Sequence, residues 1–279
     1  IAAGSGSYSL GRVQTPTLAM ICRRYAENKV FTSQTYWQIR LEFMKDDIHF
    51  NSFSVDTYTD HHKADSESER IYQVGIATVK DVSEKTVTEK APLLYDLTNL
   101  QKDANKKHSY PAQETLDIAQ TLYEKKLITY PRTGSRYISG DVFAEIGTIA
   151  GTLSKMDRFA GDSVLFSYPV NQTCINNEKV TDHHALLITE NVLENLPEKE
   201  QNIYDMFCYR ILEAFSSDCQ KKVTTISFDA RGFDFVTRSV TVTQLGWRGI
   251  HKGYAPEDTE NERLTDMLSM KVGDGFEMS

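Results

Sequence analysis

The sequence predicts an α+β chain in which one β-rich unit is interrupted by a helical insert. Residues 35–90 alternate apolar and polar side chains, and the same alternation resumes within residues 217–279. Between them, residues 91–216 carry apolar side chains at helical spacing, which predicts a helical unit with a helix-turn-helix-like arrangement. Residues 1–34 contain one further amphipathic helix. A chain of 279 residues is long enough for two or three such units.

Composition restricts the classes of function. Lysine and arginine number 31 against 39 acidic residues, a net charge of −8, so any nucleic-acid site must be a local basic groove. No apolar run of about 18 residues occurs, so no segment is expected to span a membrane. Cys22, Cys174, Cys208 and Cys219 form no C-x-x-C pair, which argues against a zinc ribbon and suits a reducing cytoplasm. Because the chain begins with Ile1 and shows no signal peptide, we expect a segment of a longer cytoplasmic protein.

The first helix is expected to begin with Thr15 as its N-cap and Pro16 in the first helical position. An apolar stripe follows to about residue 28: Leu18, Ile21, Cys22 and Tyr25. Arg12 and Gln14 lie just before this helix, where free N–H groups and an arginine can bind a phosphate. From spacing alone, a capped helix with a solvated arginine is the simpler interpretation.

The first β-rich stretch predicts three strands. One starts at Trp37 and buries alternate residues through Phe43, a second starts at Ile48, and Ala77–Lys90 forms the third. The polar segment Asp60–Arg70 is expected to be a solvated loop. Its pair His61-His62 has no third ligand placed nearby, so a solvated loop is favoured over a metal site.

The helical unit is predicted as several helices around one loop. Pro111 starts the second helix, Ser139 or Asp141 caps the third, and Arg210 lies on the last. The residues expected on the buried faces are, in order, Leu94, Leu97, Leu100, Leu116, Ala119, Tyr123, Leu127, Val142, Ile146, Ile149, Leu153, Ile203, Phe207, Ile211, Ala214 and Phe215.

The loop between the second and third helices carries residues suited to attack on a phosphodiester. Pro131 disfavours the helical region for Tyr130, and in extended chain residues i and i+2 project to the same side. Tyr130 and Arg132 can then reach one phosphate together. A phenol, with a pKa of about 10, needs nearby positive charge to act as a nucleophile, and a guanidinium can bind two phosphate oxygens. On spacing alone, a packed tyrosine at a helix exit is the commoner outcome.

A second polar group occurs at Asp182-His183-His184-Ala185. A histidine near a phosphodiester can hydrogen-bond the phosphate or transfer a proton near neutral pH. From the residues alone, a histidine pair that caps a buried segment is the favoured interpretation.

Two stretches, LITYPRTGSRY at residues 127–137 and GRVQTPTL at residues 11–18, resemble signatures of type IA DNA topoisomerases, the topoisomerase III branch in particular. The resemblance implies that Tyr130 forms a 5′-phosphotyrosine link to one DNA strand, with Arg132 as its catalytic partner. It further implies DNA contacts by the following residues: Arg12, Gln14, Thr15, Arg136 and His183.

The resemblance also implies a domain organisation. Residues 1–34 would be part of the arch domain, 35–90 and 217–279 the two parts of a split gate domain, and 91–216 the helical tyrosine domain. Two positions depart from the family pattern: Gly134 stands where aspartate is frequent, and no proline follows His183-His184-Ala185.

The implied activity is ATP-independent cleavage and religation of single-stranded DNA, with strand passage that relaxes or decatenates DNA. In the family, Mg²⁺ is bound by the acidic cluster of a Toprim domain, which no residues here match. This chain is therefore expected to bind no metal and to be inactive by itself. A non-catalytic DNA clamp or interaction module is the alternative, and a tyrosine recombinase is disfavoured because no His-x-x-Arg motif occurs.

Overall fold

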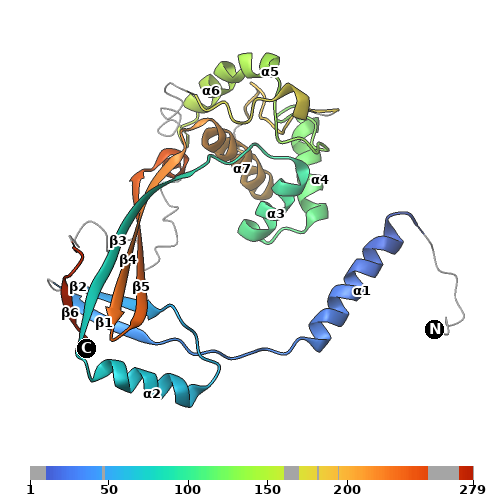
Figure 1. Cartoon of the computed structure of the whole chain (residues 1–279). Coiled ribbons are helices and arrows are strands. Elements are labelled where there is room, and N and C mark those ends of the chain that lie inside the picture. The colour runs from blue at the N-terminus through green and yellow to red at the C-terminus, as the bar shows by residue number, and fades with distance from the viewer. Residues whose placement is uncertain are drawn as a thin grey trace, which may run out of the picture.

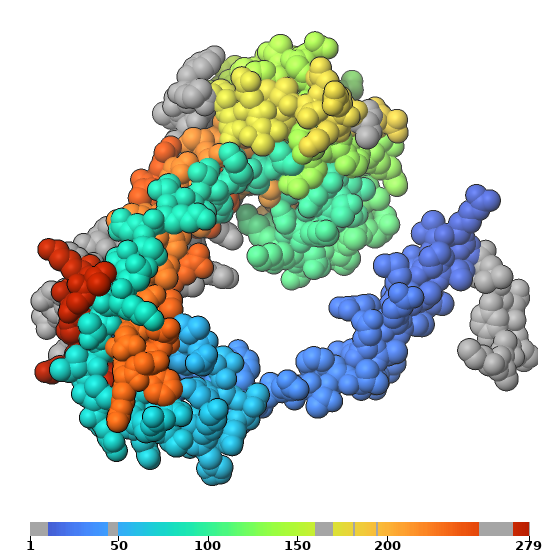
Figure 2. Space-filling view, in the orientation of Figure 1, coloured from blue at the N-terminus to red at the C-terminus, as the bar shows by residue number. Residues whose placement is uncertain are grey.

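The computed structural model describes residues 11–45, 48–159, 170–180, 182–193, 195–250 and 270–278. It confirms an α+β fold, in which a sheet unit and a helical unit are connected by long antiparallel strands (Figure 1). Helix α1 (Gln14–Val30) projects from the sheet unit and faces the helical unit across an open space (Figure 2). Residues 1–10 and 251–269, which fall in the first and last predicted units, lie outside the described residues.

All pairings in the sheet are antiparallel, in the order β1-β2-β5-β4-β3-β6. The strands are β1 (Arg40–Lys45), β2 (Ile48–Ser54), β3 (Ile76–Glu89), β4 (Cys219–Ala230), β5 (Phe233–Gln244) and β6 (Gly275–Glu277). A bridge between Phe43 and Met278 joins the two edges, so the sheet nearly closes on itself. Because β3 precedes the helical insert and β4 follows it, their long pairing joins the two β-rich stretches into one sheet.

Aromatic rings fill the interior of the nearly closed sheet. Phe43 stacks on Phe228 with ring centroids 5.0 Å apart, and Phe50 and Phe276 pack around them. Ile39, Leu41 and Phe43 are buried, as the alternation predicts. The strand itself begins at Arg40, because the main chain of Trp37 pairs with Tyr58 instead of with β2.

The prediction of a loop at Asp60–Arg70 is wrong. The segment forms helix α2 (His61–Tyr72), and the Asp60 side chain caps it by accepting a hydrogen bond from the His62 N–H. Only Ala64 and Ile71 are buried, so the apolar stripe is too narrow to be evident in a polar sequence. Ion pairs one turn apart, such as Arg70 with Glu67, support the exposed face.

The predicted start of α1 is also wrong. The helix begins at Gln14, Val13 occupies the cap position without a side-chain bond, and the Thr15 hydroxyl accepts from the Gly11 N–H at 3.3 Å. Pro16 is tolerated in the third helical position because the first four N–H groups of a helix have no partner within it. The predicted apolar stripe is present, but no residue of α1 is buried.

The helical unit packs around α7 (Glu198–Phe215), whose predicted apolar face is buried. The other helices are α3 (Leu97–His108), α4 (Ala112–Glu124), α5 (Gly140–Ala144) and α6 (Ile146–Ser154), with 3₁₀ turns η2 (Asn177–Lys179) and η3 (Gly246–Ile250). Ser139 caps α5, one of the two predicted caps.

Three details of the predicted helices are corrected. Leu94 lies outside the first helix, since the Asp96 side chain caps α3 at Leu97. On α4, Leu122 is buried in place of Tyr123. The third predicted helix is divided into α5 and α6 at Glu145. The apolar period locates these helices, whereas caps and packing decide where each one begins and which neighbouring residue is buried.

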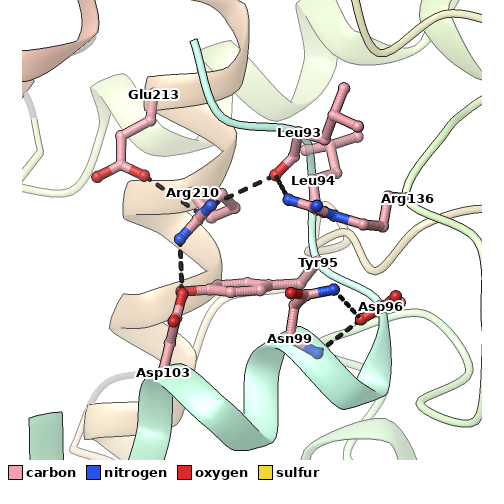
Figure 3. Close-up of polar contacts among 9 residues, drawn as sticks. All are labelled: Leu93, Leu94, Tyr95, Asp96, Asn99, Asp103, Arg136, Arg210 and Glu213. Carbon is pink, nitrogen blue, oxygen red and sulfur yellow. Dashed lines mark hydrogen bonds and ion pairs between the residues drawn. The ribbon is translucent and has the colours of Figure 1, made fainter. Parts of the chain in front are cut away.

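Arg210 on α7 is the centre of a polar cluster that joins α7 to α3 and to the chain arriving from β3 (Figure 3). Its Nη2 donates to Asp103 Oδ2 at 2.8 Å and to the Tyr95 hydroxyl at 3.0 Å, and its Nη1 donates to the Leu93 carbonyl at 3.4 Å. Glu213 Oε2 lies 3.3 Å from Arg210 Nε in an ion pair. Burial raises the pKa of the Glu213 carboxyl, and the Arg210 charge partly opposes this shift.

None of the helices that the structure describes has the length and apolar character needed to cross a membrane. The four cysteines are free thiols; Cys22 is exposed and the other three are buried.

We predict that Arg210→Met destabilises the helical unit by about 3 kcal/mol, because it removes the cation that pairs with Glu213 inside the unit. The value is at the low end for a buried pair because Asp103 keeps solvent contact. Urea unfolding followed by circular dichroism at 222 nm measures the effect. Lys199 lies on the same helix and forms an exposed ion pair with Glu114, so Lys199→Gln is the matched control and should change stability far less. Equal losses in both variants would show that the cluster adds nothing beyond a surface pair.

Candidate active site

The loop that carries Tyr130 begins where α4 ends. Lys126 has a left-handed backbone conformation (φ 59°), and the Leu127 N–H donates to the Leu122 carbonyl at 3.0 Å, which ends the helix in a tight reversal. Leu127 and Ile128 are buried directly afterwards. The reversal therefore brings the loop back into the core three residues before Tyr130.

Main-chain pairing with a distant segment holds this loop in place. Ile128 forms a bridge with Ile188, and the Thr129 N–H donates to the Leu187 carbonyl at 2.9 Å. The Leu187 N–H in turn donates to the Thr129 hydroxyl at 3.0 Å. The loop thus gains strand-like hydrogen bonds although it belongs to no sheet.

The same pairing brings His183 to Tyr130. Their ring centroids are 4.8 Å apart at an interplanar angle of 51°, and Tyr123 of α4 meets the Tyr130 ring edge-on at 5.5 Å and 76°. Tyr130 is half-buried, so its ring is held while the side chain keeps access to solvent. His184 is directed elsewhere, since its Nδ1 lies 2.6 Å from the Ala185 carbonyl oxygen.

Arg132 is exposed on the surface of the loop. Within the described part of the chain, no hydrogen bond or ion pair engages its guanidinium, and the flanking residues Pro131 and Thr133 are buried. An arginine with its donors free, two residues from an accessible tyrosine, can bind an anion that approaches the loop.

Arg136 is directed into the protein, as Figure 3 shows. Its Nε donates to the Leu94 carbonyl at 3.1 Å and its Nη2 to the Leu93 carbonyl at 3.3 Å. These bonds fix the segment that leads from β3 into α3. A DNA contact by Arg136, as the family resemblance implies, would compete with two main-chain hydrogen bonds, so this arrangement favours a structural role for the side chain.

The glycine that departs from the family pattern does not distort the loop. Gly134 is exposed, and a Cβ added there would meet no atom within 4 Å. The position therefore has room for a Cβ, and glycine is not required there to avoid a clash.

Arg12, Gln14 and Thr15 lie at the N-terminal end of α1, apart from the Tyr130 loop (Figure 1). Their predicted place at a helix N-terminus is correct, except that Gln14 and Thr15 belong to the first turn of the helix itself. The structure does not bring them to the tyrosine, since α1 faces the helical unit across open space (Figure 2).

Around Tyr130, the described residues form no group of three potential metal ligands. Among the described residues, one group of three potential ligands lies close enough together to bind a metal: His61, His62 and Asp65 on α2, in the sheet unit. Mg²⁺ prefers oxygen ligands in octahedral geometry, so two imidazoles and one carboxylate suit it poorly. The expectation that His61-His62 lacks a third ligand is wrong, because the helix brings Asp65 within 2.8 Å of His61.

Sequence reasoning missed two residues at the site. The sequence predicts Tyr123 on the buried face of α4 and does not single out Thr133. Thr133 is buried, and its hydroxyl donates to the His183 carbonyl at 3.0 Å. No periodicity marks such a contact, because the two residues are 50 positions apart.

Comparison with known proteins identifies the class. A family model described as DNA topoisomerase matches residues 2–279. The full-length topoisomerase I of Thermotoga maritima has a similar structure, with a TM-score of 0.67 over 98% of this chain and 44% of that chain. The sequence identity there is 18%, so this likeness supports the fold alone.

The chain belongs to the DNA topoisomerase family, in the type IA class that its sequence signatures indicate. It is 34% identical over 281 residues to DNA topoisomerase 3 of Bacillus cereus and 34% identical over 277 residues to that of Bacillus subtilis. Each alignment covers 95% of this chain, and the chain spans 37% and 38% of the length of these relatives.

We predict that Arg136→Gln lowers the free energy of unfolding by about 1–2 kcal/mol, because the carbonyls of Leu93 and Leu94 lose charged donors. Arg132→Gln, on the exposed side of the same loop, is the control and should leave stability nearly unchanged. Urea denaturation of both variants measures the difference. A loss of stability in Arg132→Gln alone would reverse our assignment of the two arginines.

Proposed function

We propose that this chain is the strand-cleaving part of a type IA DNA topoisomerase and that Tyr130 is its nucleophile. The observation that carries the proposal is the arrangement of the loop. A half-buried tyrosine packs on His183, and two residues later follows an exposed arginine whose guanidinium has no partner in the part of the chain that the structure describes. The family membership supports DNA as the substrate, since the relatives are DNA topoisomerases.

In the proposed reaction, the Tyr130 oxygen attacks the phosphorus of one strand of DNA. The phenol loses its proton, a bond forms between Tyr130 and the 5′-phosphate, and the bond from phosphorus to the 3′ oxygen breaks. The 3′ oxygen takes up a proton and leaves as a hydroxyl. Attack by this hydroxyl on the phosphotyrosine reverses the step, so the energy of the phosphodiester is retained and no ATP is needed.

Arg132 has the role of a cation at the reacting phosphate. Negative charge increases on the phosphate oxygens in the transition state, and a guanidinium can donate to two of them at once. His183 lies against the Tyr130 ring, where its imidazole can hydrogen-bond the same phosphate or carry a proton.

The remaining components of the reaction belong to other parts of a longer enzyme in this proposal. Near Tyr130 the described residues form no group of three potential metal ligands, and a net charge of −8 gives the chain little attraction for DNA. We therefore propose that the magnesium site and further cations approach Tyr130 from outside the chain. The sheet unit would act as the gate through which another strand passes, with relaxation or decatenation as the result.

The proposal is tested by replacing Tyr130 with phenylalanine in a full-length enzyme that contains this chain. Tyr130→Phe is expected to abolish the covalent adduct with a labelled single-stranded oligonucleotide and to leave binding nearly unchanged, because only the hydroxyl is lost. Denaturing electrophoresis detects the adduct. The chain by itself, with Mg²⁺, should give no adduct and only weak, salt-sensitive binding.

Two outcomes contradict this account. An adduct that persists in Tyr130→Phe removes Tyr130 from the reaction and favours the non-catalytic clamp as the role of the loop. A strong adduct from the chain alone shows that it contains every catalytic group.

Arg132→Ala is expected to slow cleavage by about 10²–10³-fold, the effect of removing one preorganised donor from a transition state. Arg132→Lys should recover only part of this rate, because an ammonium cannot donate to two oxygens in the geometry of a guanidinium. Single-turnover rates of adduct formation measure both variants. Wild-type cleavage in Arg132→Ala would place this side chain outside the reaction.

A further inference from the structure

The position of the His183 ring depends on how its main chain is held. Ala185 and Leu186, two residues that follow it closely, donate their N–H groups to the carbonyls of Tyr137 and Tyr95 at 2.8 Å each. At His183 itself this main-chain pairing has ended. Among the described residues, the one hydrogen bond that reaches the His183 main chain comes from the hydroxyl of Thr133.

Thr133 is built firmly into the loop. Its side chain is buried, with 6% of the residue exposed, and its carbonyl accepts from the Leu97 N–H at 3.1 Å. The hydroxyl has two partners: it donates to the His183 carbonyl at 3.0 Å and accepts from the Ser135 N–H at 3.1 Å. The direction of its proton is therefore determined, because the Ser135 N–H can only donate.

Thr133 consequently links the two sides of the site. It lies three residues after Tyr130 in the same loop, and its hydroxyl binds the segment that carries the histidine. The Tyr130 and His183 rings, 4.8 Å apart, form another contact between these two segments. A buried hydrogen bond beside a ring contact restricts the sliding that a ring contact alone permits.

We infer that Thr133 is a positioning residue for strand cleavage: its hydroxyl sets the place of the His183 imidazole beside Tyr130. This inference rests on the proposed function of Tyr130. Thr133 touches neither the phosphate nor the attacking oxygen in this account, and its effect passes through His183.

The test is a double-mutant cycle in a full-length enzyme that contains this chain, measured as the single-turnover rate of covalent adduct formation. Thr133→Val keeps the shape and removes the hydroxyl, and it should slow cleavage about tenfold, the effect of one hydrogen bond. Thr133→Ser keeps both bonds and should cleave within about twofold of the wild-type rate. In a His183→Ala background, Thr133→Val should have almost no further effect.

Thr115→Val is the matched control for a loss of stability alone. Thr115 is a buried threonine of α4 in the same unit, and its hydroxyl donates to the Pro111 carbonyl at 3.1 Å. Thr115→Val should lower the melting temperature by about as much as Thr133→Val does, and it should leave the cleavage rate unchanged. If Thr133→Val does not fold, Thr133→Cys replaces it, because a thiol of similar size donates only weakly.

The outcomes separate this inference from the proposed function. No adduct at Tyr130 in the wild-type enzyme overturns the proposed function. With that adduct present, a wild-type rate in Thr133→Val or in His183→Ala overturns the inference. A loss of rate in Thr133→Val that is equally large in the presence and absence of His183 also overturns it, because Thr133 would then act without the histidine.

Discussion

The site depends on the main-chain pairing of one buried segment, residues 185–188, with three other parts of the chain. Its N–H groups and bridges reach Tyr95 before α3, Ile128 and Thr129 after α4, and Tyr137 before α5. All four residues of the segment are buried, so their main-chain polar groups need partners inside the protein. These partners include the loop that carries Tyr130. The need to satisfy a buried main chain thus gives an irregular loop a defined shape.

Two arginines also tie the Tyr130 loop to the segment that arrives from the sheet unit. Arg136 of the loop and Arg210 of α7 both donate to the Leu93 carbonyl, which lies where the chain from β3 enters the helical unit. The Tyr95 phenol, whose pKa burial raises, lies under the Arg210 guanidinium and also donates to Asp103. The Tyr130 loop, helix α7 and the segment between β3 and α3 are therefore joined to one another by hydrogen bonds.

Burial gives the two loop arginines different roles. Arg132 and Arg136 are four residues apart, and their spacing in the sequence does not distinguish them. Arg136 is partly buried and donates to carbonyl groups, whereas Arg132 is exposed and its guanidinium has no partner among the described residues. In the proposed function, Arg132 is the exposed cation that meets the reacting phosphate, whereas Arg136 holds the main chain.

The sequence by itself determined the class of the protein and the order of its units. The alternation at Ile39, Leu41 and Phe43 and the apolar period of α7 identify buried faces, because each pattern is local and repeats at the spacing of its element. The signatures around Tyr130 and Gly11 identify the family for the same reason, since each is contiguous in the chain.

Local patterns failed where the signal was too short or fitted more than one position. The α2 helix was missed because its buried stripe consists of two residues, and the cap of α1 was misplaced because proline is compatible with several positions of a first turn. Only the tertiary structure decided which distant groups meet: it directed Arg136 inward to the Leu94 carbonyl and joined Thr133 to a carbonyl 50 residues away. Such contacts depend on how separate segments pack, and no local spacing in a sequence encodes that packing.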